Sequence, residues 1–397
     1  MPTALTLATI VALVINLAVR ISPNGVHRII GSWGRPGHIG AGLASWPTDF
    51  SGGILPVPCH SHNDYWRTVP LYSAIEAGCT GVEADIWLFA EHLFVGHSIA
   101  SLTPNRTLNS LYIDPLLDIL SKQNPKETLI SDQDSTVHGV FDTDPEQSLV
   151  LLIDFKTAGD LLWPYVQSAL EPLRVRNYLT RSNKTEVLFG PVTVVGTGNA
   201  PFDLVNSEAS NPHHDIFFDA PLQDMLEEAI DNNSEALAKV GNRPSVVSSP
   251  EQTIDTNGGD LGEDRSIAKV QRKRSDQGGQ GKSGTAGNNP DVFDQGNSFY
   301  ASVAFGTAIG QLDDGQFSQH QMDLLRGQIR GAHRRGLKAR YWDLPFWPIG
   351  LRNHVWDVLV KEGVDMLNVD DVKAATQRDW NAYRGWWHPS KSNSADV

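Results

Sequence analysis

The sequence predicts an α/β protein folded as a closed (β/α)8 TIM barrel. Short apolar segments typical of buried strands alternate with amphipathic segments typical of helices along most of the 397 residues. Such alternation indicates βα units and a parallel sheet. The number of strand-like segments is near eight, which favours a closed barrel over an open doubly wound sheet. No GxGxxG turn follows the first strand, and this weakens a dinucleotide-binding alternative.

The strands are expected where apolar runs are short and bounded by turn residues. They cover residues 54–59, 81–88, 148–157, part of 185–198, 214–221, 337–345 and 364–372, with a short extended segment at 91–97. The helices are expected at 70–77, 110–122, 161–173, 222–230, 321–336 and 351–363. Gly78 directly follows the first of these helices and is a typical helix stop.

The barrel is expected to span residues 54–385, preceded by an irregular lead-in at 25–53 and followed by a tail at 386–397. Residues 1–24 contain an almost wholly apolar run, which indicates a signal peptide or a signal anchor. Residues 248–297 are dense in Gly, Ser, Asp, Asn and Gln and are interpreted as a disordered insertion.

Charge and cysteine content restrict the classes of ligand that the protein can bind. The net charge of −14 argues against nucleic acid, whose phosphates need a basic face. An acidic chain can still bind a phosphate ester through a divalent cation. The two cysteines, Cys59 and Cys79, cannot form a zinc cluster of paired CxxC motifs. They are expected to be buried free thiols, because Cys59 ends one strand and Cys79 precedes the opposite end of the next.

The amino-terminal segment suggests the secretory pathway, with a secreted or membrane-anchored protein. Asn105, Asn183 and Asn232 each begin an N-glycosylation pattern and fit that location. The amino terminus does not resemble an arginine-rich mitochondrial transit peptide.

Three acidic residues at strand ends predict a metal site. Glu83 and Asp85 lie two apart in one strand, so they point to the same side. Asp154 ends the next strongly apolar strand, and neighbouring strands of a barrel bring their carboxyl ends together. A hard divalent cation would balance the three carboxylates, with Mg²⁺ preferred and Ca²⁺ also suitable. Lys156 would point into the same mouth and suits a phosphate.

Two histidines flank this acidic group along the sequence. His60 ends the first strand and His97 follows the segment after Glu83 and Asp85. A pair of groups that titrate near neutrality indicates one general base and one general acid. This combination suits a phosphodiester, in which one oxygen loses a proton and another gains one. Zinc ligation by the histidines is the competing interpretation, but the oxygen-rich set favours a harder ion.

At these residues the chain resembles a known family. The runs "CHSHNDYWR", "VEADIWL", "LFVGH" and "LLIDFKT" are similar to those of metal-dependent phosphodiesterases of the phospholipase-C-like barrel superfamily. That superfamily includes glycerophosphodiester phosphodiesterases and sphingomyelinase D toxins. Together with the late "YWDLP" and "GVDMLNVDD", the motifs resemble fungal proteins of the "altered inheritance of mitochondria protein six" type over about residues 40–385. The resemblance implies His60, Glu83, Asp85, His97 and Asp154 as site residues.

The sequence departs from glycerophosphodiester phosphodiesterases at the first motif, where "HSHNDY" stands in place of "HRG". This leaves the substrate open, and also the choice between His60 and His62. We predict that His60 transfers protons, that His62 supports the loop or binds substrate, and that Asn63 faces the site.

Several late residues are expected around the pocket. Trp342 is expected to wall the pocket or to pack in the core, and Asp343 and Asn368 are candidate polar liners. Asp370 and Asp371 are interpreted as a helix N-cap pair.

The prediction is therefore a divalent-cation-dependent phosphodiesterase acting on a phospholipid or a glycerophosphodiester-like substrate, and associated with a membrane. The sequence does not choose between attack by water and internal attack that gives a cyclic phosphate. The alternative from another class is a membrane-associated scaffold with little turnover.

Overall fold

The computed structural model describes residues 9–14, 25–38, 40–41, 50–125, 137–183, 186–227 and 289–378. The chain divides into two compact units, residues 1–50 and residues 51–397. Most of the apolar segment predicted at 1–24, and most of the insertion predicted at 248–297, lie outside the described residues. Within the described part of the chain, every helix is too short or too polar to cross a membrane.

The first unit contains helix α2 (Gly25–Ser32), whose side chains are exposed. The irregular lead-in predicted at 25–53 is therefore wrong for this segment. Val26, Ile29 and Ile30 recur at helical spacing, and this amphipathic pattern outweighs the surrounding glycine and proline residues.

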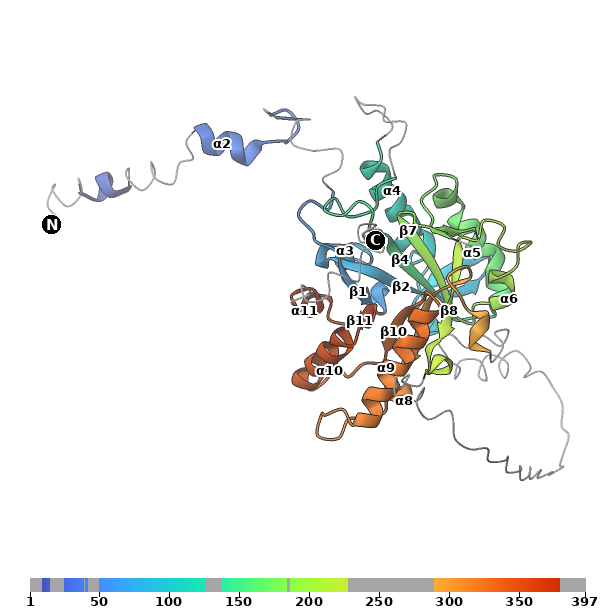
Figure 1. Ribbon diagram of the computed structural model, residues 1–397. Coiled ribbons are helices and arrows are strands. Elements are labelled where there is room, and N and C mark those ends of the chain that lie inside the picture. Colours follow the sequence, from blue (N-terminus) through green and yellow to red (C-terminus); the bar gives the residue numbers. More distant parts are fainter. Residues whose placement is uncertain are drawn as a thin grey trace, which may run out of the picture. The chain divides into compact units, whose positions relative to one another are not determined.

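In the described part of the second unit, eight parallel strands close into a barrel (Figure 1). Strand β1 pairs with both β2 and β11, and these two pairings close the ring. Around the ring the strands are β1 (Val57–Ser61), β2 (Cys79–Phe89), β4 (Leu149–Phe155), β7 (Val192–Gly198), β8 (Ile216–Pro221), β9 (Ser298–Ala304), β10 (Lys338–Trp342) and β11 (Met366–Val369). The predicted fold class is confirmed.

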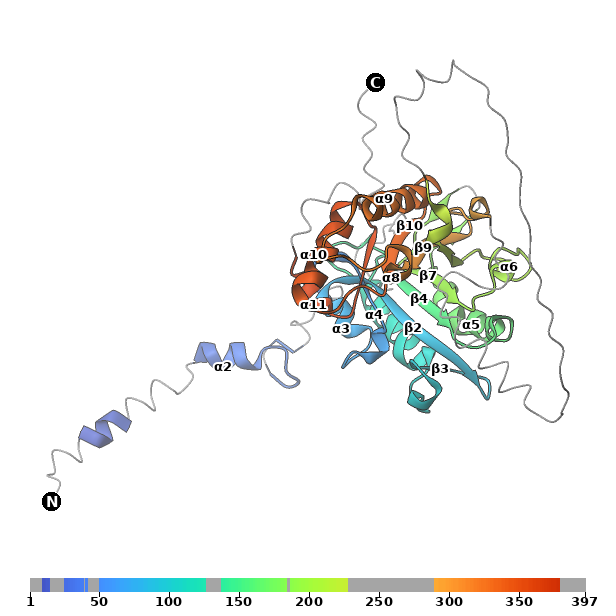
Figure 2. The same ribbon diagram turned by 90° about the horizontal axis from the view of Figure 1, so that it is seen from below.

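Helices surround the barrel in the view of Figure 2. They are α3 (Tyr72–Ala77), α4 (Asp114–Gln123), α5 (Gly159–Arg174), α6 (Phe202–Val205), α8 (Phe305–Ala308), α9 (Gln319–Arg334), α10 (Ile349–Lys361) and α11 (Val372–Thr376). Shorter elements are β3 (His92–Val95), the pair β5 (Arg181–Ser182) and β6 (Val187–Leu188), the 3-10 turns Asp64–Trp66, Ile99–Ser101, Leu222–Met225 and Pro290–Val292, and a π-helical turn Asn109–Ile113. Gly78 ends α3 with φ 97°, as predicted.

Two elements differ from the sequence prediction. Strand β9 was not predicted, because it directly follows the low-complexity insertion and consists mostly of small residues around the adjacent Phe299 and Tyr300. The predicted helix at 222–230 is wrong for residues 222–227, the part that the structure describes. Only a 3-10 turn, Leu222–Met225, forms there. The segment around Met225 packs closely on α9: a Cβ on Gly331 would lie 1.6 Å from the carbonyl oxygen of Met225. The close approach favours the 3-10 turn over a wider helix.

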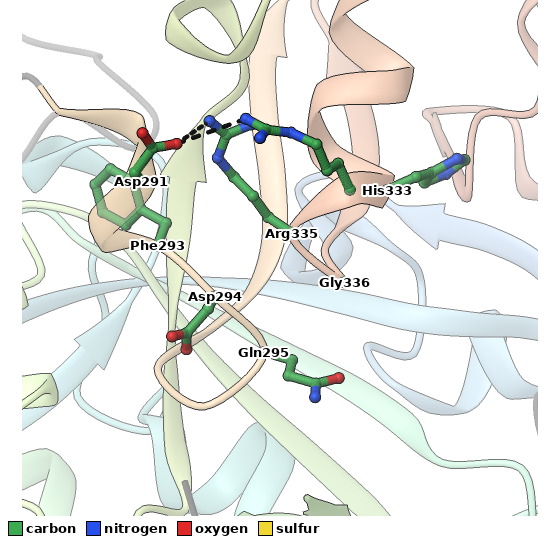
Figure 3. A pocket seen from close by; sticks show the side chains of 8 residues that line it. Asp291, Phe293, Asp294, Gln295, His333, Arg335 and Gly336 are labelled. Carbon is green, nitrogen blue, oxygen red and sulfur yellow. Dashed lines mark hydrogen bonds and ion pairs between the residues drawn. The ribbon is translucent and has the colours of Figure 1, made fainter. Parts of the chain in front are cut away.

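The amino ends of β9 and β10 border a cavity of about 530 Å³ (Figure 3). Most of its charged side chains are already paired with opposite charges. Arg335 Nη2 lies 2.5 Å from Asp291 Oδ1, and Arg335 Nε donates to the carbonyl of Pro290 at 3.0 Å. His333 Nε2 lies 2.6 Å from Asp365 Oδ2. Paired charges of this kind hold the loops together and leave few groups for a ligand.

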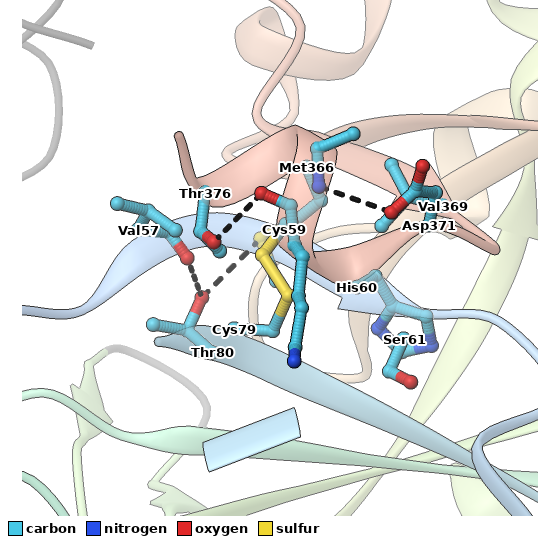
Figure 4. Close-up of a disulfide and its surroundings, with 12 residues drawn as sticks. Val57, Cys59, His60, Ser61, Cys79, Thr80, Met366, Val369, Asp371 and Thr376 are labelled. Carbon is cyan, nitrogen blue, oxygen red and sulfur yellow. Dashed lines mark hydrogen bonds between the residues drawn. A yellow bond between two sulfur atoms is a disulfide. The ribbon is translucent and has the colours of Figure 1, made fainter. Parts of the chain in front are cut away.

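A disulfide joins Cys59 of β1 to Cys79 of β2 (Figure 4). The prediction of two free thiols is therefore wrong. β1 starts later than predicted and continues to Ser61, so Cys59 lies in mid-strand. Val57 pairs with Cys79, and a register shift in β1 brings the two cysteine Cα atoms to 4.7 Å.

Candidate functional site

The "HSHND" segment folds around one buried carboxylate at the carboxyl end of β1. Asp64 accepts hydrogen bonds from Ser61 Oγ at 2.8 Å and from the Leu71 amide at 2.6 Å. Tyr112 from the π-helical turn donates to it as well, at 3.1 Å. Burial raises the pKa of Asp64, although these hydrogen bonds oppose the shift. Asp64 thus fixes the loop that carries His62 and Asn63.

Glu83, Asp85 and Asp154 form a buried acidic cluster. Glu83 and Asp85 lie two apart on the inner side of β2, and Asp85 is the register partner of Asp154 on β4. Their carboxylate oxygens lie within 4.8 Å of one another. The Asn63 amide donates to Glu83 Oε2 at 3.2 Å. The strand pattern therefore brings together the three acidic residues that the sequence singled out.

Gly198, at the end of β7, leaves room for Asp154. Its φ is +66°, and a Cβ there would lie 2.1 Å from Asp154 Oδ1. Burial raises the pKa of Asp154 to about 6; Lys156 opposes that shift, and Asp85 and Glu83 add to it. The mutual repulsion of the carboxylates is thus only partly compensated.

Lys156 supplies the nearest positive charge to the cluster. Its Nζ lies 2.6 Å from Asp154 Oδ2 and 3.1 Å from Asp85 Oδ2. Burial alone would lower the pKa of Lys156, but Asp154 and Asp85 outweigh it and raise that pKa. A protonated Lys156 therefore bridges two of the three carboxylates.

The cluster fits a divalent cation. Asp85 Oδ1 is buried and lacks a hydrogen-bond partner among the described residues. Such an oxygen is costly to bury without a counter-charge. Glu83, Asp85 and Asp154 together offer only carboxylate oxygens, the donors that Mg²⁺ and Ca²⁺ take. The site residues can hold one such ion.

His62 and His97 lie on either side of the cluster. His62 Nε2 is 3.9 Å from Glu83 Oε2, and its Nδ1 is 2.9 Å from Asp370 Oδ1. His97 Nδ1 is 3.8 Å from Asp85 Oδ2. Both side chains reach solvent, with exposed fractions of 24% and 55%. Burial alone would lower the pKa of His62, but Glu83 and Asp370 outweigh burial and raise it.

His60 stands differently from what we predicted. It is completely buried in the barrel, on the same strand face as Gly81, with its ring edge against Tyr300. Burial, and then Arg340, lower the pKa of His60 well below its usual value. The reason is depth in the barrel: His60 lies within β1 and points into the interior, whereas His62 follows the strand and reaches the mouth. His62 is thus the histidine of this segment that reaches the mouth, and which of the two transfers protons stays a prediction.

Asp370 also departs from its predicted role. Asp371 does cap α11, because its side chain accepts from the Ala374 amide at 3.0 Å. Asp370 instead orients His62. The two predicted caps thus divide into one cap and one partner of a site histidine.

Sequence reasoning missed Tyr65 and Arg340. The Tyr65 hydroxyl donates to Asp85 Oδ2 at 2.8 Å and lies 3.3 Å from His97 Nδ1. Arg340 is fully buried and donates to Asn368 Oδ1 at 2.8 Å, with Glu83 Oε2 at 3.8 Å. A cation in an apolar strand, two residues before Trp342, was the available signal.

The remaining predicted liners occupy the late strands. Asn368 is buried on β11 beneath the cluster, where it accepts from Arg340. Trp342 ends β10 half-buried, and its Nε1 has no hydrogen-bond partner in the described chain. Asp343 is exposed, with φ 55°.

Fold and site together define a parallel-barrel protein of the phosphodiesterase-like class, with a buried acidic cluster at its mouth. Residues 48–219 match the model of an AIM6-like phosphodiesterase domain. The chain belongs to the family of altered inheritance of mitochondria protein 6, which confirms the resemblance seen in the sequence.

Curated relatives extend this similarity beyond the matched domain. The altered inheritance of mitochondria protein 6 homolog of Arthroderma benhamiae is 37% identical over 340 residues, which cover 83% of this chain and 86% of that protein. The altered inheritance of mitochondria protein 6 of Eremothecium gossypii is 33% identical, with 80% of this chain and 68% of that protein covered. The protein of that name from Saccharomyces cerevisiae strain YJM789 is 28% identical over 81% of this chain and 71% of its own.

Proposed function

We propose that this protein cleaves phosphodiesters with the help of a divalent cation, on a phospholipid or a glycerophosphodiester-like substrate. The observation that supports it best is the placement of His62 and His97 on either side of the acidic cluster. A group that removes a proton and a group that returns one are what phosphodiester cleavage requires.

Glu83, Asp85 and Asp154 would hold the ion, with Mg²⁺ preferred. When bound, a divalent cation offsets negative charge on the phosphoryl oxygens. The ammonium group of Lys156 now bridges Asp154 and Asp85, and it would be released from them if the cluster held a cation. Lys156 would then serve as a point charge for a phosphate oxygen at the mouth.

His62 is the proposed base. A hydrogen on Nδ1 that is donated to Asp370 leaves Nε2 unprotonated, and Nε2, which lies 3.3 Å from Asn63 Nδ2, can then take the proton of the attacking oxygen. The bond from that oxygen to phosphorus forms while the bond to the leaving oxygen breaks. His97 then donates a proton to the leaving oxygen, and Tyr65 positions His97. Attack comes from water, or from a substrate hydroxyl that gives a cyclic phosphate.

The proposal is tested on the full chain with a panel of lysophospholipids, sphingomyelin and glycerophosphodiesters. Each is incubated with Mg²⁺, Ca²⁺ or EDTA and followed by phosphorus NMR. We expect a new phosphorus signal with Mg²⁺ that is absent in EDTA, and its shift separates cyclic from open phosphate. His213→Ala, on an exposed loop before β8, is the matched control and should be fully active.

Two outcomes contradict the proposal. Turnover that persists in EDTA would exclude the metal requirement. No turnover on any diester, together with no Mg²⁺ binding by calorimetry, would favour a membrane-associated scaffold.

We also propose that the protein resides in the secretory pathway. The Cys59–Cys79 disulfide supports an oxidising compartment. Asn105 and Asn183, which begin two of the glycosylation patterns, are exposed. The natural protein should shift in mass on endoglycosidase treatment, and an unchanged mass with two titratable thiols would argue for a reducing compartment.

A further inference from the structure

The loop after β10 presents large apolar side chains to solvent. Phe346 is 79% exposed and Trp347 is 67% exposed. Ile349, which begins α10, is also exposed. Consecutive apolar groups outside a core lose the free energy that burial would provide, so such a cluster indicates a surface that becomes covered.

A second apolar group lies on the loop after β1. Trp66 is 60% exposed, and Val69, three residues further along the chain, is also exposed. The Trp66 ring contacts the ring of His97 at a centroid distance of 4.9 Å. This group therefore borders the candidate site directly.

The loop after β11 connects the two groups. Arg67, next to Trp66, donates to the carbonyl of Asp370. On the other side, Arg352 in the first turn of α10 donates to Asp371 Oδ2 at 2.9 Å. Trp66, Val69, Phe346, Trp347 and Ile349 thus flank one corner of the barrel mouth, and we call them the apolar rim.

Exposed aromatic side chains concentrate at this end of the barrel. Among the described barrel residues, Trp66, Phe346 and Trp347 stand at the carboxyl end, and Phe189, before β7, stands at the amino end. The uneven distribution associates the exposed aromatic surface with the mouth rather than with the molecule as a whole.

We propose that the apolar rim docks the barrel mouth on a lipid bilayer of low surface charge. Tryptophan and phenylalanine beside aliphatic residues suit the boundary between head groups and acyl chains. The net charge of −14 and the exposed Asp370 and Asp371 disfavour a strongly anionic membrane. A protein partner on the rim would cover the mouth, whereas a bilayer can supply the diester to it. This inference deepens the proposed function and rests on it for the diester alone.

The first test is oxidative footprinting of the full chain, with and without phosphatidylcholine vesicles. We expect oxidation of Phe346 and Trp347 to fall severalfold on vesicles, while Phe189 stays equally reactive. This readout reports which end faces the bilayer, even where the amino-terminal segment also binds. Equal change at both ends, or no change at the rim, would overturn the proposal.

Two further outcomes of the footprinting would assign the apolar rim to a different partner. Protection by phosphatidylserine vesicles alone would overturn the assignment to a surface of low charge. Protection without vesicles, growing with protein concentration, would assign the rim to a second copy of the chain and overturn docking on lipid.

A double variant separates this inference from the proposed function. Phe346→Ser with Trp347→Ser should lower turnover of vesicle-borne lipid about tenfold and leave turnover of a soluble glycerophosphodiester unchanged, because it removes bilayer burial only. Phe189→Ser is the matched control and should change neither. If the double variant turned over vesicle lipid as fast as the wild type, the inference would be contradicted. Rim protection without turnover of any diester would contradict the proposed function alone.

Discussion

The two ends of the barrel hold their charges in different ways. At the amino end, Asp365 accepts from His333 and from the Ala339 amide, and Arg335 pairs with Asp291. At the carboxyl end, Glu83, Asp85 and Asp154 crowd together, with one lysine bridging two of them. Carboxylates at one end are compensated, and those at the other repel one another.

This difference separates structural charge from functional charge. A paired charge contributes to the fold and needs no ligand. A buried carboxylate that keeps a free oxygen raises the free energy of the folded chain until a cation arrives. The cavity at the amino end is therefore the weaker candidate, although its volume is large.

The largest expected effect is obtained by neutralising one carboxylate at each end of the barrel. Asp85→Asn should lower turnover at least about 10³-fold and abolish Mg²⁺ binding, because several kcal/mol of charge stabilisation disappear. In EDTA its free energy of unfolding should equal or exceed that of the wild type, since repulsion falls. Asp365→Asn should lose stability and keep turnover. Activity assays and urea unfolding in EDTA measure both.

The comparison fails if the two variants behave alike. A destabilised Asp85→Asn in EDTA would mean that the acidic cluster is structural, and retained turnover in that variant would remove the metal from the mechanism.

The next effect concerns the histidines. His62→Ala should lower turnover at least about 10²-fold with little change in unfolding free energy, as expected for a positioned acid–base group. His60→Ala should mainly lower stability, because His60 fills the barrel interior against Tyr300. Kinetics and thermal unfolding of both variants separate these roles. Stable but inactive His60→Ala, with active His62→Ala, would restore the prediction made from sequence.

The acidic cluster could be found from the sequence because strand alternation and strand ends determine it. Glu83 and Asp85 needed only period two, and Asp154 needed only the end of an apolar run. The histidine choice could not be made in the same way, since it depends on whether β1 ends at residue 59 or at residue 61. A shift of that size moves a side chain between the mouth and the interior.

The disulfide and Arg340 were unpredictable for a related reason. Bridging Cys59 to Cys79 requires the register of β1 on β2, including its irregularity, and composition carries no register. The role of Arg340 depends on its contacts with Glu83, Asp219 and Asn368, which come from three other strands. Contacts between distant parts of the chain decide such residues.

Arg340 and Arg335 sharpen the comparison of the two ends through stability. Arg340→Met should cost about 3–5 kcal/mol, because it leaves Glu83 and Asp219 buried without their cation. Arg335→Met should cost about 1 kcal/mol, because its partner Asp291 is exposed. Urea unfolding in EDTA measures both. Equal losses would show that the amino-end pairs carry as much of the fold as the buried arginine.

The last expected effect is a difference in pH dependence between two carboxylates. Burial raises the pKa of Asp219 to about 6, with Arg340 opposing the shift. The stabilising contribution of its protonated form is fully present below the unfolded pKa, near 4, and is lost as the pH rises through 6. Asp219→Asn does not titrate. It should therefore gain on the order of 2 kcal/mol relative to wild type between pH 4 and pH 7.

Glu362, before the amino end of β11, should give the opposite slope. The hydrogen bond from Arg326 lowers the pKa of Glu362, and burial opposes that shift less strongly. Its contribution is present above the unfolded pKa and lost as the pH falls through the folded pKa. Glu362→Gln should thus lose stability relative to wild type as the pH rises from acid to neutral. Urea unfolding in EDTA across this range measures both slopes, and slopes of the same sign would mean that Asp219 is compensated like a charge at the amino end.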